Sequence, residues 1–396
     1  MSNKIDNYYP SLRFPEFYKT KDWSILPISN FLEESKIEGS RGNTAKKITV
    51  KLWGKGVTKK SENYHGSIAT QYFKRKSGQF IYSKLDFLNQ AFGIIPDELD
   101  GFESTIDLPC FDFKGNIVPL FFLKYVMRPI FYKKNGEVAD GGRKAKRIQQ
   151  SIFLNFPIAV PELPEQQKIA DCLSSLDELI EAHEQKLDAL KQHKKGLMQR
   201  LFPAEGETTP RWRFPEFRNA GKWTIKKLGA IANNLDHKRI PISANKRAKG
   251  NIPYYGASGI VDYINDFIFN QNLLCISEDG ANLISRVTPI AFSISGKSWV
   301  NNHAHVLEFN TFECQKFIEN YINSINIEEF LTGMAQPKLN KSKLDSIPIP
   351  LPNSSVEQQK IADFFTSINE CIELQKEKLL ILQNHKQGMM YQLFPH

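Results

Sequence analysis

Two stretches of the chain carry apolar residues three and four positions apart in alternation, the spacing of a helix that pairs along one seam. The first seam comprises Ile169, Leu173, Leu176, Ile180, Leu187, Leu190, Leu197 and Leu201, with the polar residues His183 and Lys194 in two further slots. The second comprises Ile361, Phe365, Ile368, Ile372, Leu379, Leu382, Met389 and Leu393, with Gln375 and Lys386 in the same two slots. We predict two long helices that pair as a coiled coil, because each seam otherwise lacks a matching partner. An internal core helix in each half of the chain is the alternative.

Signals for the start of a helix precede both seams. Pro164 suits the first helical position ahead of Glu165, and Ser354 with Glu357 forms a capping-box pattern. A helix from Glu165 to Phe202 would be roughly 57 Å long.

The repetition extends beyond the seams. The sequence FPEF at 14–17, followed by Trp23, returns at 214–217, followed by Trp223; EQQKIAD at 165–171 returns at 357–363, and LFP ends both helical stretches at 201–203 and 393–395. An internal repeat of this size predicts two related units.

Between the repeated segments, short runs of Ile, Val, Phe, Tyr and Thr are broken by Gly, Asn, Asp and Pro, which predicts short strands with some helix. The predicted fold class is therefore α+β, with two α/β domains, two long helices and a pseudo-two-fold internal repeat. We expect domains at 1–160 and 211–352, helices at 161–203 and 353–396, and a linker at 204–210.

Composition sets the broad class of protein. The 396 residues are 41% hydrophobic and 24% charged, as in soluble multi-domain proteins. No apolar run reaches the roughly 18 residues that span a bilayer, and the N-terminal residues lack the apolar core of a signal peptide, so we expect a cytoplasmic protein with no membrane partner. The five cysteines, Cys110, Cys172, Cys275, Cys314 and Cys371, form no CxxC pair, and we interpret them as buried free thiols.

The net charge of +9 is weak evidence for a polyanionic partner, but its distribution says more. Cations interleaved with an aromatic residue crowd one stretch of the first domain: Lys46, Lys47, Lys51, Lys55, Lys59, Lys60, Tyr72, Lys74, Arg75 and Lys76. A second cluster before the first long helix comprises Arg143, Lys144, Lys146 and Arg147. We expect the cations to bind phosphates and the aromatic side chain to contact sugars or bases. A solvated lysine-rich face is the alternative for any single cluster.

The second domain carries its own candidates for DNA contact. They are Lys238, Arg239, Lys246, Arg247, Lys249, Tyr254, Tyr255, Ser258, His303, His305, Gln336, Lys338, Asn340 and Lys341. Residues 336–341 offer amide and ammonium donors of the kind that reach base edges or phosphates. His303 and His305 would share a strand face as metal ligands could, but no third ligand follows at a diagnostic spacing, so DNA contact or packing is expected.

Signals for catalysis are weak. Asp97, Asp112 and Lys114 match the loose spacing of a metal-dependent nuclease, although so short a pattern arises readily by chance and has no copy in the second half. The chain has no GxxxxGK[ST] phosphate loop, no GxGxxG and no NPPF-like loop for base methylation. We expect no catalytic residues, no metal site and no cofactor on this chain.

The combination of motifs resembles the specificity subunit of Type I restriction-modification systems over nearly the whole chain. The resemblance rests on the duplicated FPEF, EQQKIAD and LFP segments, with YYGASG at 254–259, NNHAHVL at 301–307 and AQPKLN at 335–340. The first domain departs from the pattern, because its counterpart of AQPKLN is only the divergent RIQQSIFLN at 147–155.

The resemblance implies two target-recognition domains that each read one half of a split, asymmetric site in double-stranded DNA. The two helices would pack antiparallel, set the spacer and dock two modification subunits. Those partners would bind S-adenosylmethionine and methylate adenine, and restriction subunits would add ATP- and Mg-dependent translocation and cleavage. Two other hypotheses stay open: a nuclease that uses Asp97, Asp112 and Lys114, and a coiled-coil adaptor that does not bind DNA.

Overall fold

The computed structural model describes residues 9–61, 66–137, 147–333 and 336–395. The chain forms two compact units: unit 1 comprises residues 1–183 and 378–396, and unit 2 comprises residues 184–377. Two long helices, α4 (Leu163–Leu201) and α8 (Ser355–Gln392), each contribute to both units. Each unit therefore contains the start of one long helix and the end of the other.

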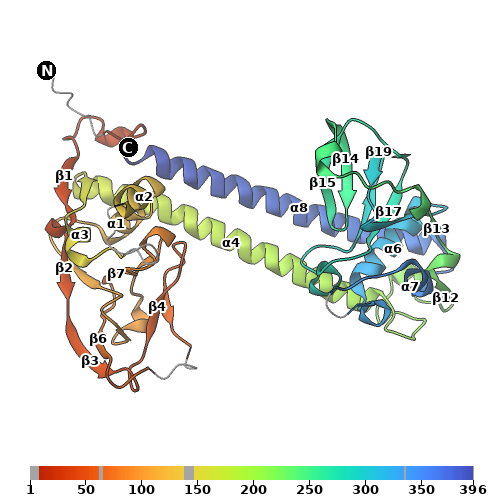
Figure 1. Ribbon diagram of the computed structural model, residues 1–396, viewed down its shortest axis with the longest axis horizontal. Coiled ribbons are helices and arrows are strands. Elements are labelled where there is room, and N and C mark those ends of the chain that lie inside the picture. The colour runs from red at the N-terminus through yellow and green to blue at the C-terminus, as the bar shows by residue number, and fades with distance from the viewer. Residues whose placement is uncertain (1–8, 62–65, 138–146, 334–335, 396) are drawn as a thin grey trace. The chain divides into compact units, whose positions relative to one another are not determined.

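The two helices lie side by side and run antiparallel in each unit (Figure 1). In unit 1, Asp177 of α4 forms an ion pair with Lys386 of α8, while the earlier Leu173 shares a core with the later Leu393. In unit 2, the Phe202 ring, just after α4, stacks on Phe365 of α8 with centroids 5.6 Å apart. The prediction of two long, paired helices is confirmed.

The burial of the helices follows the predicted seams. The buried seam residues are Ile169, Leu173, Leu187, Leu201, Ile361, Phe365, Ile372 and Leu393. The half-buried ones are Leu176, Ile180, Leu190, Leu197, Ile368, Leu379, Leu382 and Met389. No predicted seam residue is exposed, all of them being among the described residues. The partner of each seam residue across the helix pair stays a prediction.

Each unit has the same two-stranded antiparallel ribbon in front of a long helix. In unit 1 it pairs β1 (Ser24–Pro27) with β11 (Pro157–Val160), and in unit 2 it pairs β12 (Thr224–Lys227) with β21 (Pro348–Leu351). The proline-rich segments before the two helices thus form strands, as residues preceding proline favour extended backbone.

Each unit also has a four-stranded sheet. Unit 1 has the order β2-β10-β7-β8, with β2 (Leu32–Ser35), β7 (Phe80–Tyr82), β8 (Phe92–Ile94) and β10 (Cys110–Phe113). Unit 2 has the order β13-β20-β17-β18, with β13 (Asn233–Asn234), β17 (Leu273–Ser277), β18 (Ala291–Ile294) and β20 (Ala304–Glu308). Adjacent strands in both sheets are antiparallel.

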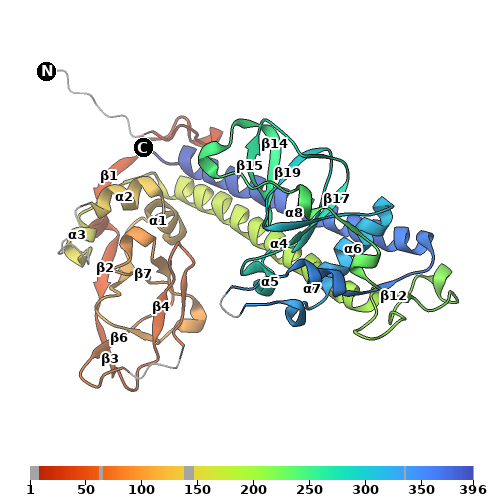
Figure 2. The same ribbon diagram turned by 45° about the vertical axis from the view of Figure 1, so that its right-hand side comes forward.

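The remaining strands differ between the units. Unit 1 has a three-stranded sheet of β3 (Ile37–Arg41), β6 (Gln71–Lys74) and β9 (Glu103–Ser104), and a hairpin of β4 (Ile48–Val50) and β5 (Val57–Lys59). Unit 2 has a four-stranded sheet in the order β15-β14-β19-β16, with β14 (Lys249–Gly256), β15 (Gly259–Ile264), β16 (Phe269–Asn270) and β19 (Lys297–Val300) (Figure 2).

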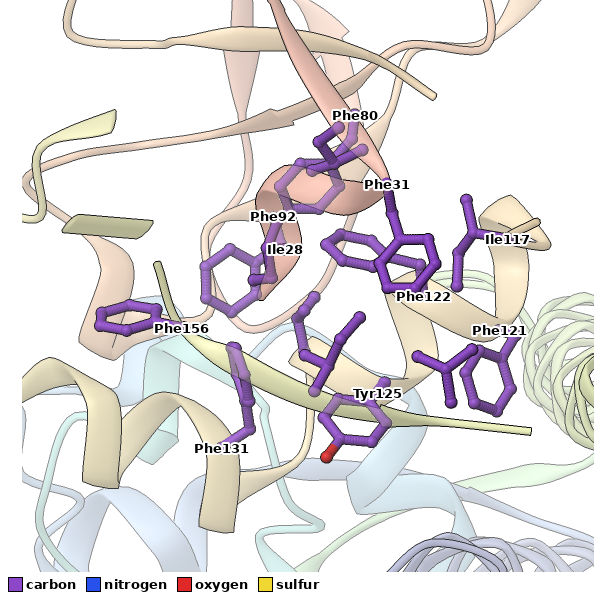
Figure 3. Packing of buried hydrophobic residues seen from close by; sticks show 14 of the residues in the cluster. Ile28, Phe31, Phe80, Phe92, Ile117, Phe121, Phe122, Tyr125, Phe131 and Phe156 are labelled. Carbon is purple, nitrogen blue, oxygen red and sulfur yellow. The ribbon is translucent and has the colours of Figure 1, made fainter. Parts of the chain in front are cut away.

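Short helices complete each unit. They are α1 (Pro119–Val126), α2 (Pro129–Gly136) and α3 (Gln150–Leu154) in unit 1, and α5 (Asn282–Ser285), α6 (Phe312–Ser324) and α7 (Lys341–Ser346) in unit 2. The core of unit 1 is rich in phenylalanine, with Phe80, Phe121 and Phe122 fully buried (Figure 3). None of the helices in the described part combines the length and hydrophobicity required to cross a bilayer.

A buried arginine–glutamate pair fastens the start of each unit to its long helix. In unit 1, Arg13 donates two hydrogen bonds of 2.7 Å to Glu165, which also accepts one of 3.3 Å from the Trp23 indole. In unit 2, Arg213 donates bonds of 2.5 and 2.6 Å to Glu357, which accepts one of 3.3 Å from Trp223. These hydrogen bonds give a physical reason why Trp23 and Glu165, the first residue of EQQKIAD, recur in the second half as Trp223 and Glu357. Sequence reasoning missed both arginines, although each precedes FPEF.

The residues just before FPEF also contact the end of the other long helix, in the same way in both units. The Leu12 N–H donates to the Gln392 carbonyl at 3.0 Å in unit 1, and the Trp212 N–H donates to the Arg200 carbonyl at 2.9 Å in unit 2. The ribbon, the arginine–glutamate pair and this contact with the helix end form what we call the repeated framework.

The cysteines do not all agree with the expectation of buried thiols. Cys110 and Cys275 are buried, and burial raises the pKa of the Cys110 thiol to about 12. Cys172 and Cys314 are half-buried. The expectation is wrong for Cys371, which lies on an exposed face of α8.

Candidate nucleic-acid interface

The β4–β5 hairpin of unit 1 gathers six of the predicted cations. Lys46, Lys47, Lys59 and Lys60 lie at its open end, where the Lys60 N–H donates to the Lys47 carbonyl at 2.9 Å, and Lys51 and Lys55 lie at its turn. Lys47 is half-buried, with its ammonium 5.6 Å from the centroid of the Tyr72 ring, and the other five lysines are exposed. The structure thus brings Tyr72 together with the lysines at the open end.

The next three predicted cations, on and after β6, do not share one face. Lys74 and Lys76 are exposed, whereas Arg75 is only 2% exposed. The Arg75 guanidinium donates to the Ser104 hydroxyl at 2.8 Å and to the Ser35 carbonyl at 2.9 Å, and burial lowers its pKa. Arg75 therefore supports the sheet rather than presenting its charge to a ligand.

Of the four predicted cations before the first long helix, only one lies among the described residues. Arg147 is exposed, and Arg143, Lys144 and Lys146 lie outside the described residues.

Unit 2 contains a cavity of about 680 Å³. It is lined by Pro241, Ile242, Ser243, Lys246, Arg247, Tyr254, Asn301, Asn302 and His303. Four of these, Lys246, Arg247, Tyr254 and His303, were predicted from sequence, while Asn301 and Asn302 were not, although they open the NNHAHVL motif. The lysine, arginine and asparagine side chains in this lining have the chemistry that binds a phosphodiester or a base edge.

The cavity residues differ in how free their polar groups are. The Arg247 guanidinium lies 4.4 Å from the centroid of the Tyr254 ring, donates to the Ile242 carbonyl at 3.0 Å and pairs with Asp262 at 3.2 Å. The buried Tyr254 hydroxyl accepts a bond of 2.9 Å from the Ile242 N–H. Lys246 and His303 are exposed, although His303 also contacts Asp279 at 2.9 Å. Lys246 and His303 are thus better placed to meet a ligand than Tyr254.

The 336–341 segment is fixed through its backbone. The Leu339 N–H donates to the Glu278 carbonyl at 2.7 Å, and Lys338 and Thr332 exchange two backbone bonds of 2.8 Å. The Asn340 side-chain oxygen accepts a hydrogen bond of 3.0 Å from the Lys343 N–H and caps α7, so this oxygen is occupied in the fold. The side chains of Gln336, Lys338 and Lys341 remain exposed.

The buried His305 holds the 336–341 segment from inside unit 2. Its Nε2 lies 2.7 Å from the Leu339 carbonyl, to which it must donate, and its Nδ1 lies 2.6 Å from Asp236. The side chain is 1% exposed, so His305 packs inside the unit rather than facing a ligand.

Asp236, Glu278 and His305 are also the one group of three possible metal ligands among the described residues, with ligand atoms within 4.8 Å of one another. Arg239 lies 2.6 Å from Glu278, and Lys338 lies 3.2 Å from it. Burial raises the pKa of the Asp236 carboxyl, but the hydrogen bond and charge of His305 and the charge of Arg239 outweigh it and lower the pKa. Because side-chain cations already balance these carboxylates, the geometry favours an internal ion-pair network over a metal site.

Four further predicted residues of unit 2 also lie outside the lining of the cavity. Lys238 and Lys249 are exposed, Ser258 is exposed in the turn between β14 and β15, and the half-buried Tyr255 packs against Phe292 with ring centroids 6.0 Å apart.

The residues of the nuclease hypothesis do not form a metal site. The Asp97 carboxylate accepts a hydrogen bond from Ser77, and Asp112 accepts one of 2.8 Å from Gln79. Neither carboxylate belongs to a group of three possible metal ligands within the described part of the chain.

Comparisons with known proteins agree with this arrangement. The family model for the Type I restriction modification DNA specificity domain matches residues 112–192 and 220–384. The chain therefore belongs to the family of Type I restriction-modification specificity subunits, whose members are the DNA-binding, non-catalytic subunits of such systems.

Individual relatives cover different shares of the chain. A putative Type I restriction enzyme specificity subunit of Haemophilus influenzae is 37% identical over 36% of this chain and 37% of its own length. The MjaVIII specificity subunit of Methanocaldococcus jannaschii is 23% identical over 98% of this chain and 96% of its own. The crystal structure of a Type I S subunit from M. genitalium has a similar fold, with a TM-score of 0.65 at 14% identity, covering 98% of this chain and 99% of that one.

The family assignment confirms the resemblance, the fold class and the expectation of a non-catalytic subunit. The nuclease and adaptor hypotheses receive no support.

Proposed function

We propose that each unit reads one half of a bipartite, asymmetric site in double-stranded DNA. The observation that carries the proposal is the contrast between the repeated framework and the surfaces that it supports. The framework is copied to the level of single hydrogen bonds, in the Arg13–Glu165 and Arg213–Glu357 pairs. Among the described residues, unit 2 has no separate two-stranded sheet that matches the β4–β5 hairpin, and unit 1 has no sheet that matches β15-β14-β19-β16, the sheet that contributes Tyr254 to the cavity. Two readers on one framework need this combination if their half-sites differ.

We assign the DNA contacts to those predicted residues whose side chains are exposed. The exposed cations of the hairpin bind phosphates in unit 1, and Lys246, His303, Gln336, Lys338 and Lys341 bind phosphates or base edges in unit 2. Arg75, Tyr254, His305 and Asn340 hold the reading surfaces in place, because their polar groups are occupied inside the fold.

The helices α4 and α8 set the spacer between the half-sites and dock two modification subunits. S-adenosylmethionine, ATP and Mg are bound by the partner subunits, adenine is the methylated base, and restriction subunits complete the assembly in the cytoplasm. The division into domains at 1–160 and 211–352, helices at 161–203 and 353–396 and a linker at 204–210 is part of this proposal.

The test is DNA binding by the full chain together with its modification subunits, measured over a range of salt concentrations. Replacing Lys46, Lys51, Lys55 and Lys60 with alanine removes up to four phosphate contacts, so the slope of log affinity against log salt should fall by about 3 to 4. Replacing the exposed Lys226 and Lys227 of β12 is the control and should leave the slope unchanged. An unchanged slope in the hairpin variant would contradict the assignment of the hairpin to DNA.

A further inference from the structure

The turn of the β4–β5 hairpin presents an exposed tryptophan in an unusual backbone conformation. Trp53 is 59% exposed and its neighbour Leu52 is 39% exposed. The φ angle of Trp53 is +61°, in the left-handed region that bulky L residues rarely occupy. A non-glycine residue in this region carries strain that the surrounding structure must hold, and such positions are enriched at functional sites.

A second loop holds Trp53 in this conformation. The Trp53 N–H donates to the Asn89 carbonyl at 2.7 Å, and the Gly54 N–H donates to the Gln90 carbonyl at 3.0 Å. Gln90 is itself left-handed, with φ +54°, and its side-chain amide donates to the Met127 carbonyl at 2.9 Å. The backbone is thus fixed by the second loop while most of the Trp53 side chain stays exposed, so this conformation does not place the indole in the core.

Both charged residues that flank Trp53 in the hairpin turn are positive. Lys51 and Lys55 flank Trp53, are exposed, and make no ion pair with any residue that the structure describes. The carboxylate of the supporting loop, Asp86, is engaged by the Ser83 hydroxyl at 3.1 Å and the Asn89 amide at 3.3 Å. The hairpin turn therefore combines a flat apolar group with free cations on both sides.

This combination fits duplex DNA better than a protein surface. The centres of protein–protein interfaces are depleted of charged residues, and lysine is depleted in such interfaces generally. Side chains that open a base step are apolar, and the phosphates on either side of the step attract cations.

We propose that Trp53 is a wedge that stacks on a base step of duplex DNA beside the half-site of unit 1, with Lys51 and Lys55 on the flanking phosphates. This inference rests on the proposed function. Such a wedge favours base steps that unstack readily, such as TA and CA. It therefore adds a sequence preference at a base step where the protein makes no hydrogen bond to a base edge.

The experiment measures duplex binding by the full chain assembled with its modification subunits, using Trp53→Ala, Trp53→Phe and Trp53→Gly. Glycine adopts the left-handed conformation readily, so Trp53→Gly should be at least as thermally stable as the unmodified chain. A loss of DNA binding in this variant therefore reports the loss of the indole and not misfolding. Tyr18→Ala is the control, because Tyr18 is an exposed aromatic residue of the same unit, at 64%, and its φ is −59°. A TA, a CA or a GC step is placed in turn beside the unit 1 half-site.

We expect Trp53→Ala and Trp53→Gly to weaken binding roughly 5- to 150-fold, with Trp53→Phe intermediate and Tyr18→Ala unchanged. The advantage of TA and CA over GC should disappear in the alanine and glycine variants. Equal affinity of all Trp53 variants, while the unmodified complex binds DNA with a steep salt dependence, overturns the wedge and leaves the proposed function standing. Absence of salt-dependent DNA binding by the unmodified complex overturns the proposed function itself. Loss of assembly with the modification subunits at unchanged DNA affinity identifies a protein contact and also overturns the wedge.

Discussion

Replacing Arg213 with alanine tests whether the repeated framework is held by its buried ion pair. The Glu357 side chain is 1% exposed and accepts two hydrogen bonds from Arg213 and a longer one from the Trp223 indole. Removal of the arginine leaves a buried carboxylate with a single remaining side-chain donor among the described residues. Breaking a buried pair in this way costs about 3–5 kcal/mol of unfolding free energy.

The size of the thermal effect follows from the size of the unit. Unit 2 contains about 200 residues, for which a loss of 1 kcal/mol lowers the melting temperature by about 2–4 °C. We therefore expect the unit 2 transition in differential scanning calorimetry to fall by about 6–20 °C in Arg213→Ala.

Two further variants make the test specific. Arg213→Met combined with Glu357→Gln removes both charges and keeps an acceptor for Trp223, so it should recover most of the lost stability. Lys360→Ala removes an exposed partner of Glu216 in the same motif and should leave the melting temperature unchanged. A loss below about 1 kcal/mol in Arg213→Ala would refute the view that this pair fastens the unit to its helix.

Three other predictions concern pH, thiol reactivity and helix length. The pKa of Asp236 is lowered in the fold, so this carboxylate stabilises unit 2 above its unfolded pKa of about 3.9, and the stabilisation is lost as pH falls through the folded value. Asp236→Asn should therefore be less stable at pH 7 but lose less further stability than the unmodified chain in denaturant titrations from pH 5 to pH 2; parallel pH profiles would contradict this. A thiol reagent should label the exposed Cys371 first and the buried Cys110 and Cys275 only on unfolding, as peptide mapping can check, and early labelling of Cys275 would contradict the described burial. Deleting 184–190 together with 376–382 removes one heptad, about 10.5 Å, from each helix, so methylation mapping should show a spacer shortened by no more than about 3 base pairs, with both half-sites unchanged. An altered half-site would show that the helices contribute to reading.

The helices and the repeated framework could be predicted because their signals are local and periodic. The spacing of Leu173, Leu176 and Ile180 defines a helical face whatever that face packs against. The copied segments made the second unit predictable from the first. The missed arginines, Arg13 and Arg213, show the limit of this reasoning, because their partners lie more than 140 residues away in sequence.

The sequence could predict which regions form the candidate interface, but not which of their side chains face outward. Residue type placed Lys74, Arg75 and Lys76 in one basic run. In the fold, the segment just after β6 buries the Arg75 side chain, which donates to carbonyl groups of other segments. Likewise, Asn340 and His305 have the chemistry of DNA contacts, yet each completes a hydrogen bond inside the fold. Trp53 carried no periodic or motif signal, and only its backbone conformation and exposure distinguish it.

The central claim is that two different readers on one framework specify one split DNA site. Its most direct test is a map of methylated adenines in a genome that carries this chain and its modification partner, repeated with Lys246→Ala combined with Lys338→Ala in unit 2. We predict two short specified half-sites separated by an unspecified spacer of fixed length, with only one half-site relaxed in the variant. A single continuous site, or relaxation of both half-sites together, would contradict the claim.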